Sequence, residues 1–278
     1  MALSAVDFEY VCRMVRADSA VALGVDKQYL VESRLAPLAA GENLLSVSDL
    51  LRRVRSDRPA LRRQVVEAML TNETLFFRDM HPFDALRDHI IPERLAANCG
   101  RLSMWSAAAS TGQEAYSLAM LLRDHFPDAD QASILATDLS ATMVERGAAG
   151  RFSHAEINRG LPASLLVRHF DRVGREWSLH DDVRRLVTWR QMNMVGPLRN
   201  VPAMDIVLLR NVLVYFDAPT RAAVIAELAQ IMRPGGYLLL GGSEITPYAH
   251  PGFQRVAVGR SIFYRVTEQR RSRVRDQR

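Results

Sequence analysis

The chain has 278 residues, of which 48% are hydrophobic, so it is long enough to bury a full core in one or two domains. Its net charge of +5 favours an acidic partner. Part of that charge lies in residues 268–278, which we expect to be a disordered basic tail, so the charge alone is weak evidence for such a partner. Its two cysteines, Cys12 and Cys99, form neither a CxxC pair nor a zinc spacing, so we expect a reducing, cytoplasmic location and no bound metal.

The N-terminal quarter of the chain shows the spacing of amphipathic helices. Apolar residues recur every three or four positions, as in Phe8, Val11, Cys12 and Val15. Charged residues interrupt this stretch, and no run in the chain approaches the roughly 20 apolar residues that span a bilayer. We therefore predict an all-α domain over residues 1–75, without export or membrane insertion, followed by a linker and junction helix.

Short apolar runs alternate with helical segments over the rest of the chain. The runs lie at 102–109, 133–139, 204–211 and 236–242, and the helical segments at 114–126 and 219–232. This alternation predicts βαβ units, with helices on both faces of a parallel sheet. At the end, the stretch 253–266 predicts an antiparallel hairpin broken at Gly259 and Arg260. A parallel sheet with a final hairpin is the layout of the Rossmann-like class I methyltransferases. We expect it over residues 100–267, with residues 76–99 as the linker and junction helix.

The first crossing from strand to helix, "WSAAASTGQEAYSLAM" at 105–120, is a candidate ligand site, because open α/β sheets bind ligands at the carboxyl ends of their strands. It holds one glycine, Gly112, whereas a dinucleotide site needs several, so NAD is disfavoured. Glu114 can pair with a cationic ligand such as S-adenosylmethionine. The alternative is an ordinary tight turn in which Glu114 is a first-turn acid favoured by the helix dipole.

The second crossing, "SILATDLS", ends on Asp138, 26 residues beyond Gly112. An acid at about this distance along the chain is placed to reach ribose hydroxyls. Asp138 also reads as a plain N-cap of the helix that follows. Taken together, the two crossings favour an adenosine ligand.

Five motifs stand in an order and spacing that resemble the CheR family of chemotaxis receptor methyltransferases: "TNETLFFRD", "WSAAASTGQEAYSLAM", "ATDLS", "LLRNVLVYFD" and "MRPGGYLLLGGSE". The resemblance covers nearly the whole chain. It implies an all-α N-terminal domain before a class I methyltransferase domain that carries a small antiparallel β-subdomain. It also implies methyl transfer from S-adenosylmethionine to glutamate side chains of chemoreceptors, leaving S-adenosylhomocysteine and a glutamate methyl ester.

The resemblance assigns cofactor contacts to nine residues: Asn72, Thr74, Arg78, Glu114, Asp138, Asn193, Met194, Arg210 and Asn211. In such proteins the segment that matches "TNETLFFRD" crosses between the domains and turns its polar residues onto the cofactor, while Phe76 and Phe77 pack the junction. A guanidinium such as that of Arg78 can hold the methionyl carboxylate through two parallel hydrogen bonds. Without the other motifs, the same stretch reads as a helix stop and restart with a capping Thr or Asn.

The expected chemistry needs no general base, because a glutamate carboxylate is already ionised near pH 7 and can attack the methyl group directly. Positioning should then dominate. The resemblance points to Arg94 and Tyr215 as residues beside the methyl pocket. The alternatives are a solvated helix residue for Arg94 and a packed aromatic for Tyr215.

Partners follow from the same resemblance. Basic residues of the N-terminal domain are expected to receive the acidic cytoplasmic helix of a methyl-accepting chemoreceptor: Arg34, Arg52, Arg53, Arg55, Arg62 and Arg63. They read equally well as solvated helix faces. The β-subdomain is expected over residues 152–192, with a hairpin that turns at Gly174. This turn resembles the short form found in members that do not tether to a receptor's C-terminal pentapeptide, so no tether is expected.

Two other functions use the same fold. A nucleic-acid methyltransferase would benefit from positive charge, but the sequence shows no basic stripe interleaved with aromatics and no base-flipping motif, so no nucleic-acid partner is expected. A noncatalytic S-adenosylmethionine-binding regulator is compatible with every cofactor motif. Only a turnover assay separates it from an enzyme.

Overall fold

The computed structural model describes residues 3–24, 26–56, 58–244 and 250–267. The chain divides into two compact units, Met1–Thr71 with Val214–Arg221, and Asn72–Leu213 with Ala222–Arg278. The predicted basic tail, 268–278, lies outside the described residues. Among the residues that the structure describes, no helix is long and apolar enough to cross a membrane.

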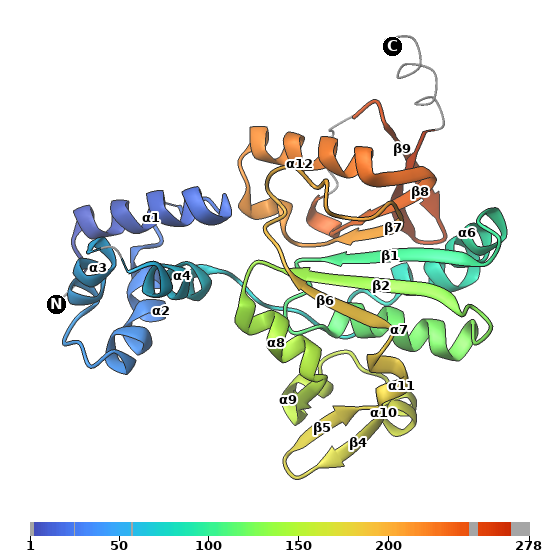
Figure 1. The fold of residues 1–278 in the computed structure, drawn as a ribbon, viewed down its shortest axis with the longest axis horizontal. Helices are drawn as coiled ribbons and strands as arrows, with labels where there is room; N and C mark the ends of the chain where they lie inside the picture. The colour runs from blue at the N-terminus through green and yellow to red at the C-terminus, as the bar shows by residue number, and fades with distance from the viewer. Residues whose placement is uncertain (1–2, 25, 57, 245–249, 268–278) are drawn as a thin grey trace. The chain divides into compact units, whose positions relative to one another are not determined.

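The N-terminal unit is helical, as predicted. Its helices are α1 (Ala5–Ser19), α2 (Gln28–Gly41), α3 (Val47–Arg55) and α4 (Pro59–Met69) (Figure 1). Ser4 and Ser46 cap α1 and α3, since each hydroxyl accepts a backbone N–H from the first turn of its helix. Apolar faces of the four helices meet in one buried cluster that includes Val11, Leu35 and Leu50.

A seven-stranded sheet forms the centre of the second unit, in the order β6-β2-β1-β7-β8-β10-β9. Its strands are β1 (Arg101–Ala107), β2 (Gln131–Asp138), β6 (Val187–Gln191), β7 (Met204–Leu209), β8 (Met232–Leu240), β9 (Phe253–Val258) and β10 (Ser261–Val266). The first five in this order pair in parallel, whereas β10 is antiparallel to both β8 and β9. Strands β7, β1 and β2 lie side by side in Figure 1. The predicted parallel sheet with a final hairpin is confirmed.

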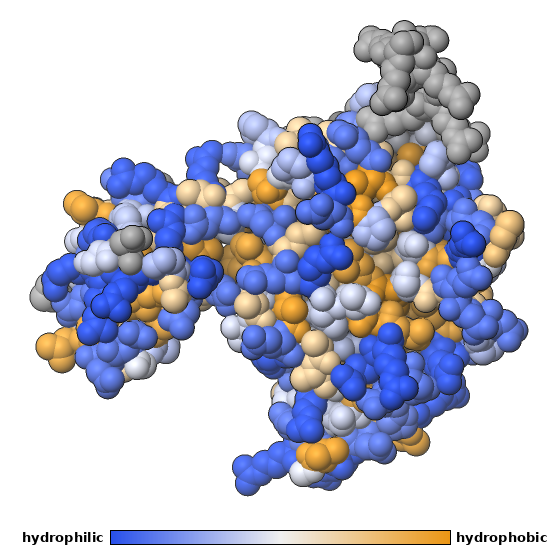
Figure 2. All heavy atoms as spheres, in the orientation of Figure 1, coloured by the Kyte–Doolittle hydropathy of each residue, from blue (hydrophilic) through white to orange (hydrophobic). Residues whose placement is uncertain are grey.

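Three longer helices accompany this sheet: α7 (Gln113–His125), α8 (Ala141–Ala149) and α12 (Ala218–Ile231). Helix α7 packs against β1, β2 and β6, and α8 packs against β2 and β6. Short helical turns follow β7, at η2 (Leu213–Tyr215), and β8, at η3 (Gly242–Glu244). Most of the face drawn in Figure 2 is hydrophilic, as expected for packing of the apolar side chains inside each unit.

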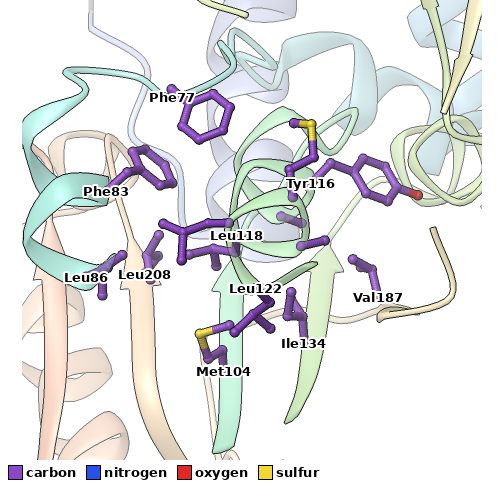
Figure 3. Close-up of a cluster of buried hydrophobic side chains, with 14 of the residues drawn as sticks. Phe77, Phe83, Leu86, Met104, Tyr116, Leu118, Leu122, Ile134, Val187 and Leu208 are labelled. Atoms are coloured by element: carbon purple, nitrogen blue, oxygen red, sulfur yellow. The ribbon is translucent and has the colours of Figure 1, made fainter. Parts of the chain in front are cut away.

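Residues 76–99 are not a bare linker, because they contribute to the core of the second unit. They form α5 (His81–Ala85), the π-helix η1 (Leu86–Ile90) and α6 (Ile91–Ala97). Phe77 and Phe83 stack edge to face with ring centroids 5.2 Å apart. Figure 3 shows these two rings with Leu86, beside Leu118 of α7 and Leu208 of β7. Burial of these aromatic side chains therefore anchors the segment within the second unit.

A small antiparallel sheet, in the order β3-β5-β4, forms the expected subdomain. It consists of β3 (Arg151–Ser153), β4 (Phe170–Val173) and β5 (Glu176–Leu179), with the short helices α9 (His154–Ile157), α10 (Ala163–His169) and α11 (Asp181–Arg184). The expected range of 152–192 is too long at its C-terminal end. Residues 187–191 instead pair in parallel with β2 as β6, the edge strand of the main sheet.

Candidate active site

The candidate site lies at the carboxyl-terminal edge of the main sheet, where the segments after β1 and β7 meet the stretch that follows residue 72. A small cavity there is lined by Glu73, Thr74, Leu75, Arg78, Ala108, Ala109, Glu114, Arg210 and Asn211. Five of the nine predicted cofactor residues thus line one cavity: Thr74, Arg78, Glu114, Arg210 and Asn211. This is the edge at which open α/β sheets bind ligands.

The turn after β1 is tightly packed. Gly112 has φ +99°, and a Cβ atom there would lie 2.8 Å from the Trp189 ring, so only glycine fits. Glu114 stands in the first turn of α7 and is buried. Its Oε1 accepts the hydroxyl of Ser106 at 2.8 Å, and its Oε2 lies 3.3 Å from Nη1 of Arg210. Packing thus fixes the turn, and the Glu114 carboxylate borders the cavity.

Asp138, the last residue of β2, holds two neighbouring loops. Its Oδ2 accepts the backbone N–H of Ser110 at 2.8 Å, and its Oδ1 accepts that of Ser140 at 2.9 Å. The cap of α8 is Ser140, whose hydroxyl accepts the N–H of Met143 at 3.3 Å. The alternative reading of Asp138 as an N-cap is therefore wrong.

Asn193 and Met194 follow β6 and come close to the end of β2. The N–H of Met192 donates to the backbone carbonyl of Asp138 at 2.8 Å, which brings the next two residues to the same edge of the sheet. Met194 is buried, and the side-chain oxygen of Asn193 accepts the N–H of Val195 at 2.9 Å. The structure thus groups Asp138, Asn193 and Met194 beside the turn that follows β1.

The stretch "TNETLFFRD" is irregular, with a turn at residues 76–79, and holds no helix restart capped by Thr or Asn. The carbonyl of Asn72 accepts the hydroxyl of Ser110 at 2.7 Å, and the N–H of Phe77 donates to the hydroxyl of Ser117 at 2.9 Å. Helix α5 begins only at His81, and its N-cap residue makes no side-chain cap bond. Phe76 packs edge to face on Phe152 with centroids 5.0 Å apart. The polar residues of this stretch are thereby fixed beside the cavity.

Backbone strain gathers around the site. Six non-glycine residues near the cavity have positive φ angles, which are disfavoured for side chains other than glycine: Phe77, Asp79, Met80, Ala108, Ser110 and Asn211. Such conformations persist where the surrounding structure enforces them, and they cluster at functional sites. At Asn211, φ is +61°, and its N–H donates to Oε2 of Glu244 at 2.6 Å.

Sequence reasoning missed three residues that support the site. Asp79 and Ser106 contact Arg210 and Glu114 respectively. The buried Glu244 also accepts the N–H of Gly241 at 2.8 Å and so ties the end of β8 to the loop after β7. Glu244 stands in the motif "MRPGGYLLLGGSE", which supported the family resemblance although no residue in it was assigned a function.

Arg94 does not lie at the candidate site, which corrects the expectation that it acts beside the methyl pocket. Its guanidinium donates to the carboxylate of Asp205 at 3.2 Å, and that carboxylate also accepts the N–H of Ser103 at 2.9 Å. Ser103 and Asp205 lie near the amino ends of β1 and β7, whereas the cavity lies beyond the carboxyl ends of these strands. Several strand residues, at about 3.3 Å each, separate the two edges of the sheet.

Tyr215 lies four positions after Asn211, in a segment that belongs to the N-terminal unit. Its backbone carbonyl accepts the N–H of Ala22 at 2.9 Å. This bond fixes the backbone at Tyr215 and says nothing about the function of its phenol group. Its role at the methyl pocket stays a prediction.

The basic residues of the N-terminal unit divide into two groups. Arg34 donates to the carbonyls of Met69 and Leu70 at the end of α4, at 2.7 and 2.9 Å, so it acts as a C-cap. Arg55 pairs with Asp7 at 2.8 Å, and Arg62 binds Asp18 through two nitrogens. These internal bonds give Arg34, Arg55 and Arg62 structural roles, which weakens the expectation that they receive a substrate.

Arg52 and Arg53 are freer. Their side chains are 73% and 50% exposed and pair with Asp49 and Glu42 at the surface. Both line a surface groove of the N-terminal unit together with Leu45, a leucine that is fully exposed. A charged groove beside an exposed apolar side chain is a suitable surface for a partner.

The strand order, the final antiparallel hairpin and the polar groups gathered at the carboxyl edge define a class I methyltransferase. The CheR methyltransferase, SAM binding domain family matches residues 72–261, and the CheR methyltransferase, all-alpha domain family matches residues 6–70. The chain belongs to the CheR methyltransferase family, and its cofactor is S-adenosylmethionine.

Similar proteins match the chain over nearly its full length. It is 37% identical to chemotaxis protein methyltransferase 1 of Pseudomonas aeruginosa, over 96% of this chain and 100% of that protein. It is 38% identical to chemotaxis protein methyltransferase Cher2 of Pseudomonas putida, with the same coverage. It is 40% identical to a chemotaxis protein methyltransferase of Vibrio parahaemolyticus, over 95% of this chain and 99% of that protein.

The residues present fit the charges of this cofactor. Its aminoacyl end carries an ammonium and a carboxylate, and the cavity offers the carboxylate of Glu114 and the guanidinium of Arg78. Within the described ranges, the Arg78 guanidinium has no acidic partner, and the buried Nε of Arg210 has no hydrogen-bond acceptor. Both groups are available to an anionic ligand group. Among these same residues no cluster of three His, Cys, Asp or Glu could hold a metal.

Proposed function

We propose that this methyltransferase transfers the methyl group of S-adenosylmethionine to glutamate carboxylates on the cytoplasmic helices of chemoreceptors. The observation that carries the proposal is the cavity at the carboxyl edge of the sheet, which unites Arg78, Glu114 and Arg210 with the crossing that follows residue 72. The names of its relatives support a role in chemotaxis. On this proposal the protein is a protein-glutamate O-methyltransferase that acts in the cytoplasm, with no nucleic-acid partner.

Each residue of the site then has a role. Glu114 accepts the ammonium of the cofactor, and Arg78 binds its carboxylate through a charge-assisted pair. Asp138 accepts the ribose hydroxyls, and Asn193 and Met194 contact the cofactor beside it. Asn72, Thr74 and Asn211 complete the cradle from the crossing and from the loop after β7.

When bound, the cofactor supplies an electrophilic methyl group on a positively charged sulfur. The glutamate oxygen forms a bond to this methyl group, the bond from carbon to sulfur breaks, and its electron pair stays on the sulfur of S-adenosylhomocysteine. No proton is transferred, since a glutamate side chain with a pKa of about 4.3 is ionised near neutral pH. The protein therefore has to align the two groups and exclude water, and Tyr215 is the proposed neighbour of the methyl pocket.

The receptor is proposed to dock on the N-terminal unit through Arg52 and Arg53. Their positive charge complements a helix that carries the glutamates to be methylated, and electrostatic complementarity of this kind favours association and correct register. The hairpin between β4 and β5 turns through only Gly174 and Arg175, which supports docking without a pentapeptide tether.

The test is incubation of the protein and methyl-labelled S-adenosylmethionine with membranes from its own organism, followed by detection of base-labile methyl esters. Labelled receptors that lose the label in alkali are the expected result. A receptor fragment with glutamine at its methylation sites is the matched control and should stay unlabelled. Tight binding of S-adenosylhomocysteine without any turnover would instead identify a regulator, and a label in nucleic acid would identify a different methyltransferase.

A further inference from the structure

Arg210 has the most crowded charged environment in the site. Its side chain is only 3% exposed, and its guanidinium meets acceptors from three residues. Nη1 lies 3.3 Å from Oε2 of Glu114, while Nη2 donates to the carbonyl of Arg78 at 3.1 Å and to Oδ2 of Asp79 at 2.5 Å. Two carboxylates thus share one buried guanidinium.

The two carboxylates are not equivalent. A buried guanidinium needs a counter-charge, because burial of an unpaired charge costs several kcal/mol. The contact with Asp79 is shorter, at 2.5 Å against 3.3 Å for Glu114, so Asp79 is the nearer of the two counter-charges. Glu114 is held from its other side by Ser106 and faces the cavity, which Asp79 does not line.

We infer that Asp79 is a positioning residue that holds Arg210 and thereby leaves the Glu114 carboxylate available to the ammonium of the cofactor. This inference rests on the proposed role of Glu114. Without Asp79, Glu114 would be the only carboxylate beside Arg210, and the guanidinium would compete with the ammonium for it. Asp79 thus sets the preference of the site for ligands that carry the aminoacyl group.

The backbone around Asp79 is built to present this carboxylate. Phe77, Asp79 and Met80 have φ angles of +46°, +68° and +49° within four residues. Asp and Asn tolerate this left-handed conformation better than most residues, and Gly adopts it without strain. Asp79→Asn and Asp79→Gly therefore remove the negative charge while the turn is kept.

The experiment measures binding of two probes to the full chain by calorimetry. S-adenosylhomocysteine carries the ammonium, whereas 5′-methylthioadenosine has the same nucleoside without the aminoacyl end. Asp79→Asn should raise the dissociation constant of S-adenosylhomocysteine about tenfold, the effect of weakening one hydrogen bond between charged groups. Binding of 5′-methylthioadenosine should change less than about twofold, because this ligand makes no use of Glu114.

Asp88 provides a matched control. Its side chain is 49% exposed, as is that of Asp79, and it pairs with Arg87 at 2.7 Å, away from the residues that line the cavity. Asp88→Asn makes the same charge change and should leave both dissociation constants unaltered. Asp79→Gly must cause the same selective loss of affinity for S-adenosylhomocysteine. It also removes the carboxylate, but it changes the conformational preference of the backbone in a different way from Asp79→Asn.

Glu114→Gln tests the role of Glu114 independently of the role of Asp79. If Glu114→Gln fails to weaken the binding of S-adenosylhomocysteine, the proposed role of Glu114 in holding the ammonium is wrong. If Glu114→Gln weakens this binding but both Asp79 variants leave it unchanged, the inferred role of Asp79 is overturned. Equal weakening of both probes by the Asp79 variants would also overturn it, because that result marks a general loss of structure. In the double variant Asp79→Asn with Glu114→Gln, the two losses should not add, since both act through one carboxylate.

Discussion

The guanidinium of Arg94 and the carboxylate of Asp205 form a buried ion pair, with side chains that are 6% and 1% exposed. Asp205 also accepts hydrogen bonds from Asn98 at 2.6 Å, from the N–H of Ser103 at 2.9 Å and from Arg233 at 2.9 Å. These donors come from the end of α6 and from the first residues of β1 and β8. Asp205 therefore joins three elements to the start of β7, at the edge of the sheet opposite the cavity.

Arg94→Ala should destabilise the protein by about 3–5 kcal/mol, because it leaves part of a buried carboxylate uncompensated. The affinity of the folded protein for S-adenosylhomocysteine should stay the same. Urea denaturation and calorimetry measure the two quantities separately. Arg87→Ala, which removes two ion pairs at the surface, with Asp84 and Asp88, should cost less than about 1 kcal/mol. A loss of cofactor affinity at unchanged stability would return Arg94 to the site.

Asp138→Ala should weaken binding of S-adenosylhomocysteine by roughly 1–3 kcal/mol, the cost of losing a hydrogen bond to a charged group. It should weaken 5′-methylthioadenosine to the same extent, since both ligands carry the ribose. This pattern differs from the selective loss expected at Asp79. Asp181→Ala, at an exposed carboxylate of α11, is the control. Unchanged affinity for both ligands would mean that Asp138 serves only to hold the loops at Ser110 and Ser140.

Asp7 links α1 to α3 and should make the stability of the N-terminal unit depend on pH. Burial raises the pKa of Asp7, but hydrogen bonds from Ser48 and Arg55 outweigh it and leave the pKa below its usual value. The folded state therefore favours the ionised form, so the stabilisation is present above the unfolded pKa of about 3.9 and is lost as pH falls through the lower, folded pKa.

Asp7→Asn should lower the free energy of unfolding by about 1–3 kcal/mol at pH 7, and the difference from the wild type should shrink in acid. Urea denaturation at a series of pH values measures this difference. Asp26→Asn, at a carboxylate that is mostly exposed, should show little effect at any pH. A difference that is constant down to pH 3 would exclude the ionised Asp7 as its source.

Local patterns in the sequence were sufficient for β1, β2, β7 and β8, for the final hairpin and for the place of Asp138 at the end of β2, because each depends on residues close together in the chain. The misplaced Arg94 and the missed Asp79 depend on partners 111 and 131 residues away, and no local pattern reveals such partners. The strand at 187–191 was assigned to the subdomain for the same reason, since only its pairing with β2 shows that it belongs to the main sheet. Contacts between distant segments therefore determine the positions of Arg94, Asp79 and the strand at 187–191, which local motifs do not reveal.

Arg52→Glu with Arg53→Glu should raise the Michaelis constant for receptor, and the effect should decrease at high salt, because both arginines are exposed and screened. Binding of S-adenosylhomocysteine should not change. Steady-state methylation of a receptor fragment at two ionic strengths provides the measurement. Arg13→Glu with Arg123→Glu makes the same charge change at other exposed ion pairs and should leave the Michaelis constant unaltered. If the two double variants behave alike, net charge rather than the groove explains the effect.

The short turn at Gly174 and Arg175 leads to the last prediction, that the protein does not bind a receptor-tail pentapeptide ending in Trp and Phe. A peptide that adds to a sheet edge needs an open strand and pockets for alternate side chains. Here the two-residue turn offers no extended loop to frame such pockets. Without a tether, no increase in local receptor concentration is available, so affinity must come from the methylated helix itself.

Titration of the full chain with this pentapeptide, followed by calorimetry and by amide NMR shifts, should show no binding in the micromolar range. Removal of the tail pentapeptide from a receptor that carries one should leave its methylation rate unchanged, because docking uses the helix. The same peptide with Trp and Phe replaced by Ala is the matched control for nonspecific heat. Micromolar binding with shifts confined to β4 and β5 would show that the short turn does not exclude the peptide, and the receptor would then be held at two places.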